Sequence, residues 1–175
     1  WNFLYGFPEE TDADYAGMAD LIEAIPHFPP PNGVGRVRLD RFSPYFESPE
    51  KYGIHNARPK PAFYGVYPFE DKSVRRLAYY FDFDLPNDRS PELFATPVLR
   101  MIHWWRSVHN GSTFTYNIQN DESLFLLDLR PNAAYPRRVL HDWEANVYLQ
   151  CEESASLEEL AAAAPSEDTL KKTLD

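Results

Sequence analysis

Four charged side chains that are close together in the sequence could bind a ligand. They lie in the stretch VGRVRLDRF, residues 34–42, where Val37 and Leu39 alternate with charged residues. If this stretch is a strand, Val37 and Leu39 share one face and Arg36, Arg38 and Asp40 share the other. Arginine binds carboxylates bidentately, so the charged face could hold a substrate carboxylate or a peptide, but it could equally be a solvated surface. The candidate substrate-binding residues are Arg36, Arg38, Asp40 and Arg41.

The residue types that bind metals are not arranged for that chemistry. The histidines show no spacing typical of metal ligands, so we expect them to be structural or surface residues, and we predict no metal site. Cys151, the single cysteine, falls on the apolar side of a helix predicted over 139–151, and we expect a buried, unreactive thiol. One cysteine cannot form an internal disulfide, which favours a reducing, cytoplasmic compartment. The five histidines are His27, His55, His103, His109 and His141.

Composition narrows the classes of partner. The chain has 175 residues, of which 43% are hydrophobic and 15% aromatic, which is enough for a globular core. Its formal charge of −10 disfavours binding to nucleic acid or to an anionic membrane. There is no run of 18 apolar residues that could cross a bilayer. We therefore expect neither nucleic acid nor a membrane as a partner.

The first part of the chain is predicted to form a βαβ unit. The apolar run Trp1–Tyr5 is typical of a strand that is covered on both faces of a parallel sheet. Thr11 and Asp14 form a capping box for a helix that ends at Pro26, and residues 34–42 form the second strand. A buried strand needs neighbours on both edges, so we expect this to be the C-terminal part of a larger protein. Alone, its exposed strands could pair in a homodimer.

The rest of the chain is predicted to change from a proline-rich segment to a hairpin followed by helices. Three segments are expected: 1–55 as the βαβ unit, 56–89 as an aromatic wrapping segment that ends in a helix over 71–81, and 90–175 as a second domain beyond the turn-prone DLPNDRSP. The second domain begins with a helix that runs to about Val108. A hairpin over 112–129 and further helices make it winged-helix-like. The prolines between 43 and 70 argue against a helix or a central strand there.

Two motifs carry a resemblance to a known family. The first is GFPEET, residues 6–11, and the second is FSP, residues 42–44, followed by Pro49. Their spacing resembles the last two strands of the partial (β/α) barrel of radical S-adenosylmethionine (SAM) enzymes, in the cobalamin-associated branch. That family has Gly-Phe-Pro-Gly-Glu-Thr in its first motif. Glu9 therefore stands where the family has a glycine, the residue that most easily adopts a positive φ.

The longer match through residues 33–54 most resembles the radical SAM C-methyltransferases that modify ribosomally made peptides. The resemblance implies that SAM lies at the C-terminal ends of the strands, as ligands do in βα barrels generally. The precursor peptide would be the substrate. The residues implied to bind SAM are Leu4, Gly6, Phe7, Pro8, Phe42, Ser43 and Pro44.

The same resemblance implies that this chain is inactive alone. Such an enzyme uses SAM, a 4Fe–4S cluster and cobalamin, and its cluster is held by closely spaced cysteine thiolates, whereas this chain has one cysteine. We expect the missing N-terminal part of the same protein to hold these cofactors, none to bind stably to this chain alone, and no catalytic residue here. The alternative is a non-catalytic peptide-binding or scaffold module.

The C-terminal segment raises a separate choice of partner. Its candidate recognition helix, SLEELAAAA at residues 156–164, has two glutamates and neither lysine nor arginine, so it would repel DNA. The segment resembles the small peptide-recognition domains of peptide-maturation enzymes, which bind a leader peptide as an added strand. Arg130, Arg137 and Arg138 could then meet an acidic leader. A stabilising lid on the barrel is the alternative.

Overall fold

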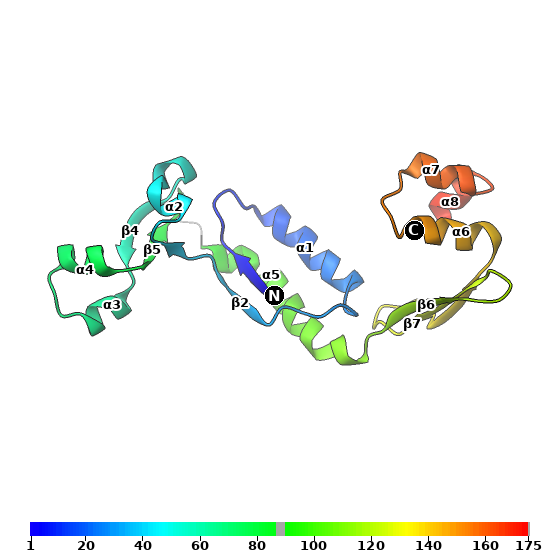
Figure 1. Ribbon diagram of the computed structural model, residues 1–175, viewed down its shortest axis with the longest axis horizontal. Coiled ribbons are helices and arrows are strands. Elements are labelled where there is room, and N and C mark those ends of the chain that lie inside the picture. The colour runs from blue at the N-terminus through cyan, green and yellow to red at the C-terminus, as the bar shows by residue number, and fades with distance from the viewer. Residues whose placement is uncertain (87–89, 175) are drawn as a thin grey trace. The chain divides into compact units, whose positions relative to one another are not determined.

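The computed structural model describes residues 1–86 and 90–174, which form two compact units. Unit 1 comprises Trp1–Ile25 and Pro29–Ser107, and unit 2 comprises Pro26–Phe28 and the chain from Val108 onward (Figure 1). The units thus divide at Ser107, whereas the predicted segments divided at 55 and 89. The predicted boundary stretch DLPNDRSP includes 87–89, which lie outside the described residues. Among the described helices, none has both the length and the apolar character needed to cross a membrane.

Unit 1 begins with the predicted βαβ unit. Strands β1 (Asn2–Tyr5) and β2 (Gly33–Arg36) pair in parallel, and helix α1 (Asp12–Ala24) connects them. The capping box predicted from Thr11 and Asp14 is confirmed. The helix ends at Ala24, just before Pro26, because proline cannot continue a helix.

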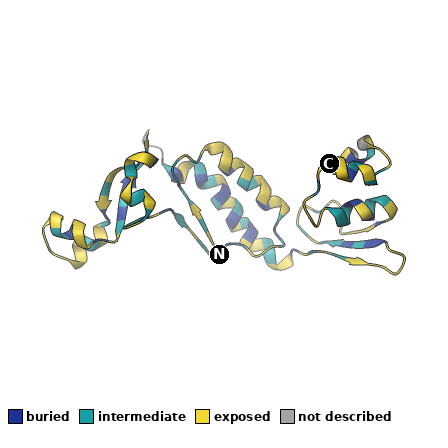
Figure 2. Ribbon diagram, turned by 45° about the horizontal axis from the view of Figure 1, so that its top comes forward, coloured by how far each residue is buried: buried dark blue, intermediate teal, exposed yellow. Residues whose placement is uncertain are grey.

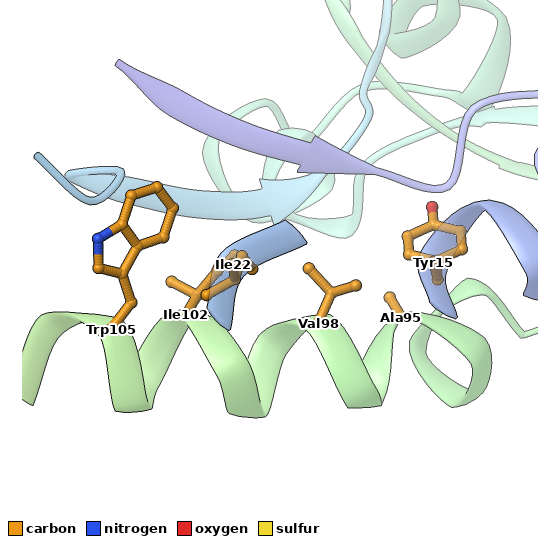
Figure 3. Close-up of a cluster of buried hydrophobic side chains, with 6 residues drawn as sticks. All are labelled: Tyr15, Ile22, Ala95, Val98, Ile102 and Trp105. Atoms are coloured by element: carbon orange, nitrogen blue, oxygen red, sulfur yellow. The ribbon is translucent and has the colours of Figure 1, made fainter. Parts of the chain in front are cut away.

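A hydrophobic cluster covers one face of this small sheet. Helix α5 (Pro91–Val108) packs against α1, and the buried residues of α5 lie on the side that faces α1 (Figure 2). Phe3 and Tyr5 of β1 pack onto the cluster, while Trp1 and Leu4 are exposed. The prediction that Trp1–Tyr5 is covered on both faces is therefore wrong for this structure. The buried members of the cluster are Tyr15, Ile22, Ala95, Val98, Ile102 and Trp105 (Figure 3).

The strand predicted over 34–42 is two strands in two sheets. After β2, the chain leaves the first sheet and β3 (Leu39–Asp40) pairs antiparallel with β5 (Tyr80–Asp84). The break occurs because Val37 and Leu39 both turn into a second buried cluster, which the second sheet covers. The helix predicted over 71–81 is also too long, since α4 (Asp71–Leu77) stops before β5. Burial in β5 alternates with a period of two, which is the strand pattern.

The proline-rich segment after Phe42 contains more regular structure than we predicted. Three of its prolines, Pro44, Pro49 and Pro61, stand at the first positions of short helices, where a missing N–H costs no hydrogen bond. Its one strand, β4, is an edge strand in the order β3-β5-β4 and ends at a proline. The elements are α2 (Pro44–Glu47), η1 (Pro49–Tyr52), β4 (His55–Pro59) and α3 (Pro61–Val66).

Unit 2 is a three-stranded antiparallel sheet followed by helices. The predicted hairpin is confirmed as β6 and β7, but a third strand, β8, occupies the start of the helix predicted over 139–151. Leu140 enters the core from β8 while Val139 is exposed, so this stretch has strand periodicity. Cys151 is exposed, and the expected buried thiol is wrong, because α6 ends one residue earlier. The elements are η3 (His109–Gly111), β6 (Phe114–Ile118), β7 (Leu124–Asp128), β8 (Arg137–Leu140), α6 (Asp142–Gln150), α7 (Leu157–Ala163) and α8 (Glu167–Leu174).

Candidate functional site

The first motif directly follows β1, whereas the second begins at Phe42, beyond the end of β2 and after β3. Because β1 and β2 are parallel and Tyr5 pairs with Arg36, both strands end at the same edge of the sheet. The Val37 N–H donates to the Tyr5 carbonyl at 2.7 Å, which extends the pairing just past β2. Phe7 of the first motif packs against the same buried cluster as Val37. In α/β folds this edge is where ligands bind.

The first motif forms a tight turn over Phe7–Glu10. The Glu10 N–H donates to the Phe7 carbonyl at 3.4 Å, and Glu9, the third residue of the turn, has φ +74°. A turn with proline second and positive φ third is of type II, and glycine is the favoured third residue. Gly6 also has a positive φ, and a Cβ there would lie 2.9 Å from the Pro91 Cβ. Gly6 is thus required for close packing against α5.

Glu10 lies in the first motif, but we predicted no role for it from the sequence. Its Oε2 accepts hydrogen bonds from the Gly6 and Phe7 N–H groups, each at 2.8 Å, and from the Tyr15 hydroxyl. Tyr15 is fully buried, and burial together with its hydrogen bond to Glu10 raises the pKa of its hydroxyl well above the ordinary value. One carboxylate oxygen therefore holds the end of β1, the turn and α1 together.

The second motif forms a similar turn. The Ser43 N–H donates to the Asp40 carbonyl at 3.1 Å, and Phe42 has φ +68° with 72% of its surface exposed. The Ser43 hydroxyl accepts from the Phe46 N–H and so caps α2, of which Pro44 is the first residue. The start of α2 thus explains why serine and proline stand at positions 43 and 44, whereas packing does not explain the phenylalanine at position 42.

A cleft opens on the face of the β1–β2 sheet that the helices leave uncovered. Its volume is about 410 Å³, within the usual range for a small-molecule site. Leu4 and Gly35 are paired in register, and a Cβ on Gly35 would meet no atom within 4 Å. The floor is therefore flat and partly apolar. The cleft is lined by Asn2, Leu4, Gly33, Val34, Gly35, Arg36 and Arg38.

The four charged candidates do not form one face, because the strand that should align them is broken. The Arg36 guanidinium lies over the Phe83 ring and 3.7 Å from the Glu92 carboxylate. Arg38 lies over the Tyr80 ring and 3.4 Å from Asp40. Arg36 and Arg38 still line the cleft.

Arg41 has a structural role instead. Its guanidinium donates to the carbonyls of Ala78 and Arg75, at the end of α4, and lies near the rings of Phe46 and Phe81. Two polar atoms in this region, Arg36 Nε and Asp40 Oδ1, are buried with no hydrogen-bond partner among the described residues. The prediction that Arg36, Arg38 and Asp40 share one face of a single strand is wrong, but Arg36 and Arg38 border the cleft.

The described residues contain no group of three or more histidine, cysteine, aspartate or glutamate side chains able to hold a metal ion. His27 lies at 4.2 Å from Phe28 and edge-on to Phe114, measured between ring centroids, and burial lowers its pKa. His109 contacts the Pro26 carbonyl. These two histidines have the structural surroundings that we expected.

The β8 edge of the unit 2 sheet could accept a further strand. The Asp128 N–H donates to the Pro136 carbonyl, so the hydrogen-bonded pairs of β7 and β8 include Leu126–Arg138 and Leu124–Leu140. The backbone groups of Arg137 and Val139 therefore point to the free edge of β8.

The three arginines predicted to meet a leader peptide have different surroundings. Arg130 pairs with Asp128 at 2.6 Å, and Arg138 pairs with Glu144 at 2.8 Å. Arg137, on the free edge, is exposed and makes no ion pair within the described part of the chain. Arg137 alone is thus available for an acidic partner.

Comparison with known proteins does not identify a family or a function for this chain. No protein-family model, curated protein or solved structure matches this chain. The described residues form a mixed α/β fold with small sheets, and the family resemblance stays a prediction.

Proposed function

We propose that this chain is the C-terminal portion of a cobalamin-associated radical SAM enzyme, a C-methyltransferase that acts on a ribosomally made peptide in the cytoplasm. The observation that carries the proposal is the pair of motif turns, each with a positive φ at its third residue: the first turn follows β1 directly, and the second lies beyond the end of β2, the parallel neighbour of β1, after the short strand β3. Unit 1 would supply the last barrel strands and part of the SAM pocket, and unit 2 would bind the precursor peptide.

The residues beside the cleft fit SAM. Leu4 and the open backbone at Gly35 offer a flat apolar surface of the kind that an adenine ring occupies. Arg38 at the rim suits the carboxylate of the methionine part, since arginine binds carboxylates bidentately. Phe42 would border the same edge from the second motif.

The residues of this chain do not fit a 4Fe–4S cluster. The chain has one cysteine, Cys151, and it lies in unit 2. A cluster needs several thiolates, so a preceding part of the same protein would hold it. The family resemblance implies that this part would hold cobalamin as well. In this class of enzyme SAM, a reduced cluster and cobalamin together supply the radical and the methyl group. The role of this chain would be to bind and orient SAM and the precursor peptide.

Unit 2 supports a peptide as the substrate. An extended peptide could add to β8 through the four backbone groups of Arg137 and Val139, which is a common mode of peptide recognition. The Arg137 guanidinium would attract an acidic residue of that peptide.

The cofactor half of the proposal is tested by expressing the chain with its native upstream sequence and reconstituting it anaerobically with iron and sulfide. We expect about four irons per chain and a brown 4Fe–4S absorbance, both lost when upstream cysteines are changed to alanine. Cys151→Ser is the matched control and should leave the iron content unchanged. Failure to bind iron in the unsubstituted protein would refute the enzyme and favour a non-catalytic peptide-binding or scaffold module.

The peptide half is tested at the free edge of β8. Val139→Pro removes an N–H that points away from the sheet, and edge strands tolerate proline. We expect it to weaken binding of the precursor peptides encoded beside the gene, with little change in the melting temperature. Ile118→Pro is the matched control, because Ile118 has the same orientation on the opposite edge, in β6. Equal losses from both variants would place the peptide elsewhere.

A further inference from the structure

One carboxylate oxygen organises the loop beyond β1. Glu10 Oε2 accepts from the N–H groups of Gly6 and Phe7, the first two residues after the strand, and from the Tyr15 hydroxyl. Hydrogen bonds to a carboxylate are shorter and stronger than neutral ones. The peptide planes of Gly6 and Phe7 are therefore held in one orientation by a side chain within the same turn.

The core fixes the second anchor of this arrangement. Tyr15 is fully buried, its ring lies 5.2 Å from that of Phe94, and its oxygen also accepts from the Gly6 N–H at 2.9 Å. Figure 3 shows the Tyr15 hydroxyl pointing from α1 towards the end of the strand above it. The hydroxyl thus transmits the position of α1 to the loop.

The same contacts decide which ligands the loop can take. In many α/β folds the backbone N–H groups after the first strand bind a phosphate. Here the N–H groups of Gly6 and Phe7 are already used by Glu10, and its negative charge would repel an anion.

We infer that Glu10 is a positioning residue of this site: acting with Tyr15, it fixes the Gly6–Glu10 turn and withholds two backbone donors from phosphate, so that the loop receives an adenosyl group without a phosphate. The inference rests on the proposed function. It goes beyond the proposed function because it assigns Glu10 a role in the selection of SAM over adenine nucleotides.

The test uses the chain with its native upstream sequence, reconstituted with iron. S-adenosylhomocysteine and AMP are the two probes, and their dissociation constants are measured by calorimetry. Glu10→Ala should weaken the binding of S-adenosylhomocysteine about tenfold or more and narrow the preference for it over AMP, because the Phe7 N–H is released and the Gly6 N–H keeps only the Tyr15 hydroxyl as acceptor. Glu10→Gln should restore most of the affinity, since its amide oxygen can still accept from both N–H groups.

Two control variants distinguish the positioning role of Glu10 from the loss of a negative charge and from a loss of stability. Glu9→Ala removes the same charge from the neighbouring residue, whose side chain is exposed and makes no hydrogen bond among the described residues. Val98→Ala destabilises the same core without touching the loop. Both variants should bind S-adenosylhomocysteine within about threefold of the unsubstituted protein, because neither substitution removes a hydrogen bond that holds the loop.

Each outcome is decisive. The inference is overturned if Glu10→Ala binds no worse than Glu9→Ala, if Val98→Ala weakens binding equally, or if the unsubstituted protein binds AMP as tightly as S-adenosylhomocysteine. In those cases iron content and S-adenosylhomocysteine binding would still support the proposed function. Absence of both iron and S-adenosylhomocysteine from the unsubstituted protein would overturn the function and the inference together.

Discussion

Replacing Glu9 by glycine is expected to stabilise unit 1. Glu9 has φ +74° at the third position of the Phe7–Glu10 turn, a conformation that suits glycine. A side chain in the left-handed region costs about 1–2 kcal/mol. Glycine loses more backbone entropy on folding, which offsets roughly 0.5–1 kcal/mol of that gain. The net gain in the free energy of unfolding should be about 0.5–1 kcal/mol.

Urea unfolding followed by tryptophan fluorescence measures this gain. In a Trp143→Phe background the remaining tryptophans, Trp1, Trp104 and Trp105, all belong to unit 1, so the signal reports on that unit alone. With a denaturant dependence of about 2 kcal/mol per molar urea, the midpoint should rise by roughly 0.3–0.5 M. The slope should not change, because the surface exposed on unfolding stays the same.

Glu9→Ala is the control for the lost charge. It removes the same carboxylate but keeps a Cβ, so the strain at positive φ remains. Its midpoint should stay at or slightly below that of the unsubstituted protein. The explanation by backbone strain is refuted if the alanine variant gains as much as the glycine variant, or if the glycine variant is the less stable protein.

Three further predictions concern unit 2. Asp128→Asn should destabilise it by about 1–3 kcal/mol, because the half-buried Arg130 loses its charged partner. Since the hydrogen bonds from Arg130 lower the pKa of Asp128, the stabilisation is present above the unfolded pKa and is lost as pH falls through the folded one. Urea midpoints measured against pH should therefore converge for the two proteins below about pH 4. Cys151 should react completely with a thiol reagent in the native protein, because it is exposed; a thiol titrating only after unfolding would contradict this. Ser156→Ala should cost about 1 kcal/mol in thermal unfolding, because the hydroxyl caps α7; an unchanged midpoint would show that the cap contributes nothing.

Sequence alone predicted the features whose partners are near in the chain. The capping box at Thr11 needs only a residue three positions later, and it is present in the structure. The β6–β7 hairpin also forms from adjacent residues. In these cases one short stretch contains both donors and acceptors, so local chemistry is sufficient.

Strands with distant partners were missed. β5 pairs with β3 and β4, which lie well before it in the sequence, and its five residues were partly included in a helix instead. The charged face was wrong for the same reason, since Arg36 pairs with Tyr5 of β1 and contacts Glu92 of α5, both distant in the sequence. The direction of a side chain after a break depends on tertiary packing, which periodicity does not contain.

The site shows the same division between local and distant information. The two motifs identified the loops, but we did not predict from the sequence that Glu10 accepts three hydrogen bonds. That role depends on the turn that brings Gly6 back over Glu10 and on Tyr15 from the helix. A turn with proline second and an acidic residue fourth is the signal that could have predicted it.

Backbone strain separates two residues that occupy similar turns. Glu9 and Phe42 are both third in a turn, and both have a positive φ. Glycine could make either turn at lower cost, but Phe42 adds a second cost, because a large ring that is 72% exposed gains little from the hydrophobic effect. It also belongs to neither buried cluster of unit 1. Strain that packing does not offset is a feature of ligand sites, so Phe42 is the residue of the second motif for which stability is the poorest explanation and contact with a ligand the best.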